Sequence, residues 1–243
     1  PRTDPPKIDK CPKCGSTEFV PETDVLDTWF DSSITCAVHA GWPDNKNWKK
    51  LYPADVHPSG YDIIRTWAYY LMIRGIALFD QKPYNSVLIN GMVLGTDGRK
   101  MSKSLGNFVA TPDVFEKYGA DAPRQWATGG GATGSDIPFR WEDVEYAWKF
   151  LRKLWNASRF ASMHLEDYVP TTKTPKLEPI DRWLLSKMEQ VTQKVTEAME
   201  TCQFNVATNE IRQFTWHSFC DNYIEAVKHR LYQPETYGTA KRQ

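Results

Sequence analysis

The sequence is poor in the two residue types that most often carry nucleophilic or metal chemistry, with five cysteines and five histidines among 243 residues. An odd, scattered set of cysteines excludes the disulfide framework that stabilises small secreted domains. No apolar run is long enough to span a membrane, and no signal peptide opens the chain. We therefore expect a cytoplasmic protein with no membrane partner.

Net charge is also missing, because 30 basic and 30 acidic side chains cancel. Such a chain has no overall attraction for nucleic acid, so any contact with RNA must come from a local basic patch. Aromatic bulk, in contrast, is plentiful, with ten tryptophans. That content excludes an intrinsically disordered chain and is sufficient for a packed core.

One polar loop carries the most specific pattern. Residues 98–107 read GRKMSKSLGN and follow an apolar run at 87–94. An open α/β sheet binds nucleotides at the carboxyl ends of its strands, and Lys100 and Lys103 can reach successive phosphates there as point charges. A generic pair of lysines after Asp97-Gly98 would indicate only an exposed basic turn, but the full string is far more specific.

The surrounding segments alternate between strand and helix. Residues 54–57 fit a strand, 61–79 a helix that Ser59 can cap, and 87–94 a buried strand. They predict a strand–helix–strand unit with a right-handed crossover, and thus an α/β fold. The glycine-rich stretch 129–134 lacks the spacing and the lysine of a phosphate-binding P-loop, so we expect a plain loop there.

From Trp141 onward the sequence shows long apolar stripes at helical spacing. Asp181 and Asn205 can cap the second and third of three long helices, which predicts an antiparallel helical bundle. The expected parts of the chain are a linker at 1–23, an α/β domain at 24–140 and an all-α domain at 141–243.

Cys11 and Cys14 form a Cys-x-x-Cys pair that fits half of a zinc knuckle. A closed structural Zn²⁺ site needs four ligands, and the other three cysteines contain no second short-spaced pair. We expect an empty or weakly occupied site.

Further strings agree with the 98–107 loop in order and spacing. They are DTWFDSS at 27–33, HPSGYDIIRTW at 57–67, NGMVL at 90–94 and KLWNASRF at 153–160. With the KMSKS run, they resemble the class I aminoacyl-tRNA synthetases over essentially the whole chain. The strings that end at Trp67 and Phe160 are most similar to the valine-specific branch, of archaeal or eukaryotic-like type.

The resemblance implies a partial Rossmann-like parallel sheet followed by an anticodon-binding helical domain. It implies an enzyme that activates valine with ATP and Mg²⁺ and transfers it to tRNA(Val). Lys100 and Lys103 match the catalytic lysines of the family loop. Ser102 and Ser104 match the hydroxyls that can order its closed form.

The remaining matches concern binding of the adenylate. Ribose contacts are implied for Gly60 and Asp62, adenine contacts for Gly91, Met92 and Val93, and the amino-acid side-chain pocket for Trp29, Ile63 and Trp67. Residue patterns alone leave other readings open, since Asp62 fits a capping box and Ile63 and Trp67 fit a core pair. His57 fits either a ligand contact or a buried structural histidine. Basic residues along the first bundle helix fit a solvated face or a tRNA-facing stripe; they are Lys149, Arg152, Lys153 and Arg159.

Two departures from the family pattern set limits. The ATP-binding His-x-Gly-His motif and the editing domain are both absent from these residues. We therefore expect a fragment that covers the second half of a catalytic domain and the start of the anticodon-binding bundle, inactive by itself. The alternatives are a fragment of the isoleucine enzyme and a noncatalytic tRNA-binding module.

Overall fold

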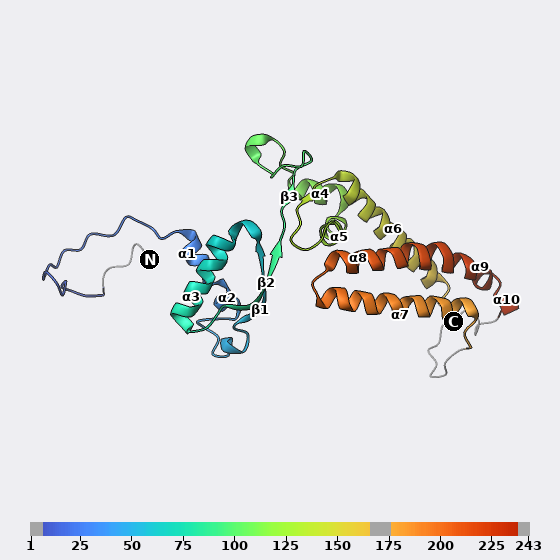
Figure 1. The fold of residues 1–243 in the computed structure, drawn as a ribbon, viewed down its shortest axis with the longest axis horizontal. Coiled ribbons are helices and arrows are strands. Elements are labelled where there is room, and N and C mark those ends of the chain that lie inside the picture. The colour runs from blue at the N-terminus through green and yellow to red at the C-terminus, as the bar shows by residue number, and fades with distance from the viewer. Residues whose placement is uncertain (1–6, 166–175, 238–243) are drawn as a thin grey trace. The chain divides into compact units, whose positions relative to one another are not determined.

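The computed structural model of the chain describes residues 7–165 and 176–237. Its backbone contacts divide it into two compact units, Pro1–Val87 and Leu88–Gln243 (Figure 1). Within the described ranges, no helix is both long and apolar enough to cross a membrane. The domain boundary expected near Trp141 falls inside the second unit. The division of the chain there into a catalytic and an anticodon-binding domain stays a prediction.

The first unit contains the expected strand–helix–strand segment. Its elements are α1 (Thr28–Ser32), α2 (Thr35–His39), η1 (Trp48–Lys50), β1 (Ala54–Gly60), η2 (Tyr61–Ile63), η3 (Ile64–Ala68), α3 (Tyr69–Phe79) and the start of β2 (Tyr84–Asn90). Strands β1 and β2 form a two-stranded sheet. The helix predicted at 61–79 is present, beginning as a 3₁₀ turn and a π-helical turn before α3. The predicted cap is wrong, because Ser59 lies in β1 and its hydroxyl donates to the Gly60 carbonyl instead.

Aromatic packing holds the first unit together. Tyr52 and Leu71 are almost fully buried, beside small residues of α2. The ring of Phe79 meets those of Trp42, Trp48 and Tyr52 at centroid distances of 5.4, 4.9 and 5.3 Å. These tilted and edge-to-face contacts add to the burial of apolar area and fix the end of α3 against the 42–52 segment.

The apolar run at 87–94 is not the buried strand that its composition predicts. Strand β2 ends at Asn90, and β3 (Val93–Leu94) belongs to a different sheet. Val87 and Val93 are 37% and 41% exposed. A continuous apolar run is typical of a strand covered on both faces, and in the described residues β2 has one neighbouring strand, β1.

The second unit begins with a small parallel sheet. Strand β3 pairs with β4 (Ile137–Pro138), with Val93 opposite Ile137. Between them lie η4 (Lys103–Leu105), α4 (Thr111–Tyr118) and α5 (Asp121–Gly129). The start of α4 at Thr111-Pro112 and its end at Gly119 are confirmed, since the proline occupies the first turn and Gly119 has a φ of 73°. The core beneath is built from Val114, Ala122, Trp126, Phe139, Val144 and Ala147.

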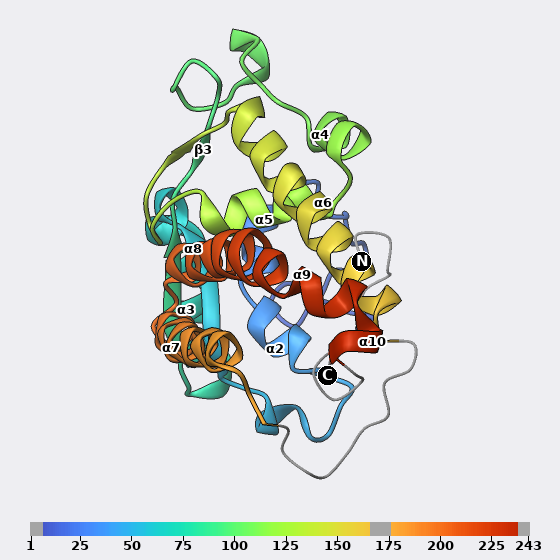
Figure 2. The ribbon, with the colours of Figure 1, turned by 90° about the vertical axis from the view of Figure 1, so that its right-hand side faces the viewer.

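The bundle follows. It comprises α6 (Trp141–Met163), α7 (Pro179–Glu200), α8 (Phe204–Gln213), the π-helical η5 (Phe214–Ile224), α9 (Glu225–Tyr232) and α10 (Pro234–Tyr237). Helices α7 and α8 lie side by side in both views (Figures 1 and 2). The expected third long helix is the run from α8 through η5 to α9.

Both predicted bundle caps are wrong by a few residues. Glu178 is the N-cap of α7, and Asp181 completes a capping box from the third helical position. Gln203 is the N-cap of α8, which leaves Asn205 inside the helix. Asp181 also accepts hydrogen bonds from Arg230 at 2.9 Å and from the Tyr223 hydroxyl at 3.1 Å. Through these bonds Asp181 connects α9 and η5 to α7.

Leu71→Ala should lower the free energy of unfolding of the first unit by about 2 to 5 kcal/mol, because Leu71 is fully buried and its removal leaves a cavity. Leu78→Ala on the same helix is the matched control, since Leu78 is 49% exposed and its loss should cost little. Urea unfolding followed by tryptophan fluorescence measures both. Equal losses in the two variants would contradict this description of the core.

Candidate functional site

The 98–107 loop leaves β3 through a tight backbone turn. An antiparallel bridge joins Leu94 to Lys100, and the Gly95 amide donates to the Arg99 carbonyl at 2.7 Å. Gly98 completes the turn with a φ of 74°, a left-handed conformation that favours glycine. The loop therefore starts from a fixed base directly after the strand, which is the position that its sequence predicts.

The Asn107 side chain closes the loop. Its Nδ2 donates to Asp97 Oδ1 at 3.0 Å and to the Lys100 carbonyl at 3.3 Å. Its Oδ1 accepts a hydrogen bond from the Ser102 amide at 2.8 Å. One amide group thus connects the turn, the middle and the end of the loop, and we call this set of bonds the Asn107 clamp.

Asp97 is the anionic part of the Asn107 clamp. Besides the bond from Asn107, it accepts bonds from the Arg99 amide at 3.0 Å and from Arg99 Nε at 2.8 Å. Hydrogen bonding from Asn107, followed by that from Arg99, lowers the pKa of Asp97 to about 2. The sequence analysis treated Asp97 only as part of a turn and gave Asn107 no role, although an Asp two residues before a donor amide is a known turn signal.

The two predicted catalytic lysines lie in different parts of the loop. Lys100 is in the bridge to β3, and Lys103 begins the 3₁₀ turn η4. Lys103 Nζ lies 5.7 Å from the centre of the Phe108 ring. The Ser102 and Ser104 hydroxyls are 2.8 Å apart and hydrogen-bonded to each other. Both lysine side chains are exposed.

The segment Gly91, Met92 and Val93 is held by backbone bonds. The Met92 amide donates to Asp136 Oδ1 at 2.8 Å, and the Met92 carbonyl accepts from the Ile137 amide at 2.8 Å. A Cβ built on Gly91 would lie 2.0 Å from the Ser135 carbonyl oxygen, so no other residue fits there. These residues and the glycine-rich stretch from Gly131 to Gly134 line one cavity of about 270 Å³.

The other predicted binding residues belong to the first unit. Gly60 precedes η2, and a Cβ there would lie 2.8 Å from Asp62 Oδ1. Trp29 lies in α1, and its amide donates to the capping carboxylate of Asp27. Ile63 ends η2, and Trp67 packs against the core while its Nε1 donates to the Ser32 carbonyl at 3.4 Å.

Comparison with known proteins now decides the family. The model for class I tRNA synthetases (I, L, M and V) matches residues 4–140, which include the loop and all the segments above. The chain belongs to this family. The anticodon-binding domain of tRNA ligases matches residues 181–242.

The similar curated synthetases are longer than the chain. The valine--tRNA ligase of Methanothermobacter thermautotrophicus is 54% identical over 92% of the chain and 25% of its own length. That of Archaeoglobus fulgidus is 52% identical over 95% of the chain and 26% of its own length. The chain therefore spans about a quarter of these relatives.

Solved synthetases share the fold. A leucyl enzyme from Agrobacterium radiobacter K84, in a ternary complex with tRNA and LeuAMS, has a TM-score of 0.76 at 23% identity, covering 96% of this chain and 30% of its own. Mycobacterium tuberculosis methionyl-tRNA synthetase with methionyl-adenylate has a TM-score of 0.68 at 24% identity. The match covers 90% of this chain and 44% of that enzyme. The synthetase architecture thus extends through the bundle, and the predicted fold class is confirmed.

His57 of this synthetase chain is a buried aromatic-cluster residue. It is 7% exposed, its ring stacks on Tyr84 at 5.0 Å, and Nδ1 lies 4.0 Å from the Cys36 sulfur. Burial lowers the pKa of His57, so the neutral ring is favoured. Its Nε2 has no hydrogen-bond partner in the described part of the chain, so both sequence-based readings stay open.

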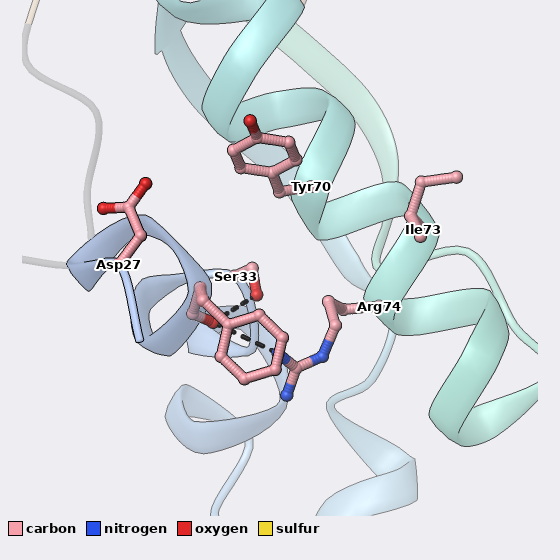
Figure 3. Close-up of a pocket in the computed structure, with 6 residues that line it drawn as sticks. Asp27, Ser33, Tyr70, Ile73 and Arg74 are labelled. Carbon is pink, nitrogen blue, oxygen red and sulfur yellow. Dashed lines mark hydrogen bonds between the residues drawn. The ribbon is translucent and has the colours of Figure 1, made fainter. Parts of the chain in front are cut away.

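A separate pocket of about 320 Å³ lies between α1 and α3 (Figure 3). Its lining is Asp27, Phe30, Ser33, Tyr70, Ile73 and Arg74. The Arg74 guanidinium lies 3.8 Å from the centre of the Phe30 ring and donates to the Phe30 carbonyl at 3.3 Å. None of the predicted site residues lines this pocket, so the structure does not gather Trp29, Ile63 and Trp67 in it.

The cysteine pair forms a knuckle-like turn. The Cys11 amide donates to the Ser16 carbonyl and the Gly15 amide to the Cys11 carbonyl, each at 2.9 Å. Hydrogen bonds from the backbone amides of Cys14 and Lys13 lower the pKa of the Cys11 thiol. Among the residues described, no three His, Cys, Asp or Glu side chains come together as a metal site. The pair supplies two ligands and does not fit a closed zinc site.

Most of the basic stripe on α6 is engaged within the protein. Lys149 pairs with Glu145 at 2.8 Å, and the Arg152 guanidinium lies 4.6 Å from the Trp148 ring. Lys153 pairs with Asp221. Arg159 is exposed. Lys149 and Arg152 stay exposed despite these contacts, so the solvated face and the tRNA-facing stripe both stay predictions.

Asn107→Ala should return the pKa of Asp97 toward its ordinary value of 3.8, because the Asn107 amide is the largest cause of its lowering. The depressed pKa means that ionised Asp97 stabilises the folded loop above about pH 4, and that this contribution is lost as the pH falls through about 2. NMR titration of the Asp97 side-chain carboxyl measures both. Unchanged titration in the variant, or a wild-type midpoint near 3.8, would contradict the Asn107 clamp.

Proposed function

We propose that the chain is the second half of the catalytic domain and the start of the anticodon-binding domain of a valine--tRNA ligase. The observation that carries the proposal is the clamped 98–107 loop, which presents two exposed lysines directly after the strand pair that holds Gly91, Met92 and Val93. The family match and the valine--tRNA ligase relatives at 54% and 52% identity support it.

In the proposed reaction a valine carboxylate attacks the α-phosphate of ATP, and pyrophosphate leaves. Negative charge then builds on the β- and γ-phosphate oxygens, where Lys100 and Lys103 supply positive charge. The Asn107 clamp fixes the base of the loop, while the hydrogen-bonded Ser102 and Ser104 stay exposed or half-buried nearby. Such a loop can close over ATP and its Mg²⁺ and reopen for product release.

The binding roles assigned by resemblance are part of the same proposal. Gly91 and its neighbours present backbone groups to adenine, and Gly60 and Asp62 contact the ribose. Trp29, Ile63 and Trp67 surround the valine side chain. Residues 141–243 bind tRNA(Val). Because the reaction belongs to translation, we place the enzyme in the cytoplasm.

Any zinc bound by the complete protein would be structural in this proposal, and no step of the reaction is assigned to it. Cys11 and Cys14 provide two of the four thiolate or imidazole ligands that a closed site needs. We propose that they are one half of a knuckle in the complete protein.

The function is tested by valine-dependent ATP–pyrophosphate exchange. The full-length enzyme should exchange with valine far better than with isoleucine, while the 243-residue chain alone should stay at background. The reason is that these residues lack the His-x-Gly-His half of the ATP site. Preference for isoleucine would assign the chain to the isoleucine enzyme. An inactive full-length protein that still binds tRNA would identify a noncatalytic module.

Lys103→Ala in the full-length enzyme should raise the barrier to valyl-adenylate formation by about 2 to 4 kcal/mol with little change in valine affinity, because the lysine charge matters most as pyrophosphate leaves. Lys187→Ala, an exposed lysine on α7, is the control. Pre-steady-state kinetics separates the two quantities. An unchanged rate with a raised valine dissociation constant would overturn the role given to Lys103.

A further inference from the structure

A small pocket in the second unit contains none of the residues proposed above for catalysis or for adenylate binding. It has a volume of about 210 Å³ and lies where α5, α6 and α8 meet. Its lining is Trp126, Gly129, Gly130, Asp143, Tyr146 and Arg212. Two of these residues bring hydrogen-bond donors that have no acceptor among the described residues.

Arg212 is the first. Its guanidinium is 5.1 Å from the centre of the Tyr146 ring, and its side chain is half-buried. The Nε atom is buried and has no acceptor, and no carboxylate pairs with the group, within the ranges that the structure describes. A half-buried guanidinium that has no ion-pair partner among these residues favours an anionic ligand.

Trp126 is the second. Its side chain is 8% exposed, and its indole Nε1 is buried without an acceptor in the described residues. Buried indole N–H groups normally have a partner, and Trp126, which lines this pocket, has none among the described residues. The two glycines keep the space open: a Cβ on Gly129 would lie 3.1 Å from Arg212 Nη2.

An aromatic ladder orients Arg212. The Tyr146 ring beside it stacks on Trp216 at 5.9 Å and an interplanar angle of 13°, and Lys153 Nζ lies 4.4 Å from Trp216. Lys153, at the far end, pairs with Asp221. The ladder therefore has an ion-paired cation, Lys153, at one end and, at the pocket, Arg212, which has no ion-pair partner among the described residues.

We propose that this pocket binds one phosphate group of the tRNA backbone, with Arg212 and the Trp126 indole N–H donating to its oxygens. Asp143 brings a carboxylate to the same pocket, which repels a dianion but can accept the hydrogen of a neighbouring ribose 2′-hydroxyl. A phosphodiester beside a ribose matches both features. The proposal rests on the proposed function, because it takes tRNA as the ligand.

The salt dependence of tRNA binding to the full-length enzyme tests it. Arg212→Gln should weaken binding about tenfold and reduce the slope of log K against log salt concentration by about 0.7 to 0.9, which is the loss of one phosphate contact. Arg124→Gln is the matched control, since it removes the same charge from an exposed position on α5. It should leave the affinity within about twofold of the wild type.

Trp126→Phe provides a second variant, because it removes the indole N–H but keeps an aromatic ring in the core. It should weaken tRNA binding a few-fold with an unchanged slope. Valine-dependent exchange without tRNA should equal the wild type in all three variants. If Arg212→Gln does not fold, tRNA binding by Trp126→Phe tests the proposal instead, and wild-type affinity in that variant overturns it.

Three results would overturn the assignment: wild-type tRNA affinity and salt slope in Arg212→Gln, equal losses of tRNA affinity in Arg212→Gln and Arg124→Gln, or ATP–pyrophosphate exchange that falls in step with tRNA binding.

Titration with inorganic phosphate, followed through the Trp126 indole NMR signal, identifies the source of the anion. Saturation at low millimolar phosphate with tRNA binding unaffected by Arg212→Gln would assign the pocket to free phosphate and overturn the RNA contact. Normal, Arg212-dependent tRNA binding by an enzyme that does not activate valine would instead reject the proposed function alone.

Discussion

The close backbone contact between Gly91 and Ser135 is the constraint on which the second unit depends. It allows β3 and β4 to pair in register, and that pairing places the 98–107 loop at the end of β3. Ser135 follows the glycine-rich stretch, where the Thr133 hydroxyl donates to the Cys202 carbonyl at 2.7 Å, in the turn between α7 and α8. One chain of short contacts thus runs from the proposed adenine-binding segment to the bundle.

Local sequence signals predicted elements better than they predicted their ends. The helix at 61–79 and the start of α4 follow from apolar spacing and from proline at the first turn, and both are present. The cap of α7 could not be placed, because an acidic residue at the third helical position and one at the cap look alike in a sequence. The cap of α8 could not be placed either, because Gln203 begins the helix without a side-chain capping bond. The predicted burial of the 87–94 run was wrong because burial depends on neighbouring strands, and among the described residues β2 pairs with β1 alone.

In the candidate site, too, some residues could be predicted from the sequence and others could not. The lysines and serines of the 98–107 loop could be named because their string is specific, and the roles given to them stay predictions. The contact between Asp97 and Asn107 could not be predicted, because a ten-residue separation carries no periodic signal and only the folded loop brings them to 3.0 Å. The Arg212 pocket was invisible for the same reason, since Trp126, Asp143 and Arg212 come from three helices.

The π-helical geometry of η5 determines which neighbours its side chains meet. Residues seven apart lie on the same face of an α-helix, yet Trp216 stacks on Tyr146 of α6 while Tyr223 hydrogen-bonds to Asp181 of α7. The wider i→i+5 turns rotate these two side chains toward different partners. Insertion or deletion of a single residue in 214–224 would therefore exchange partners along the whole segment, which makes its length, more than its composition, the quantity that the bundle cannot vary.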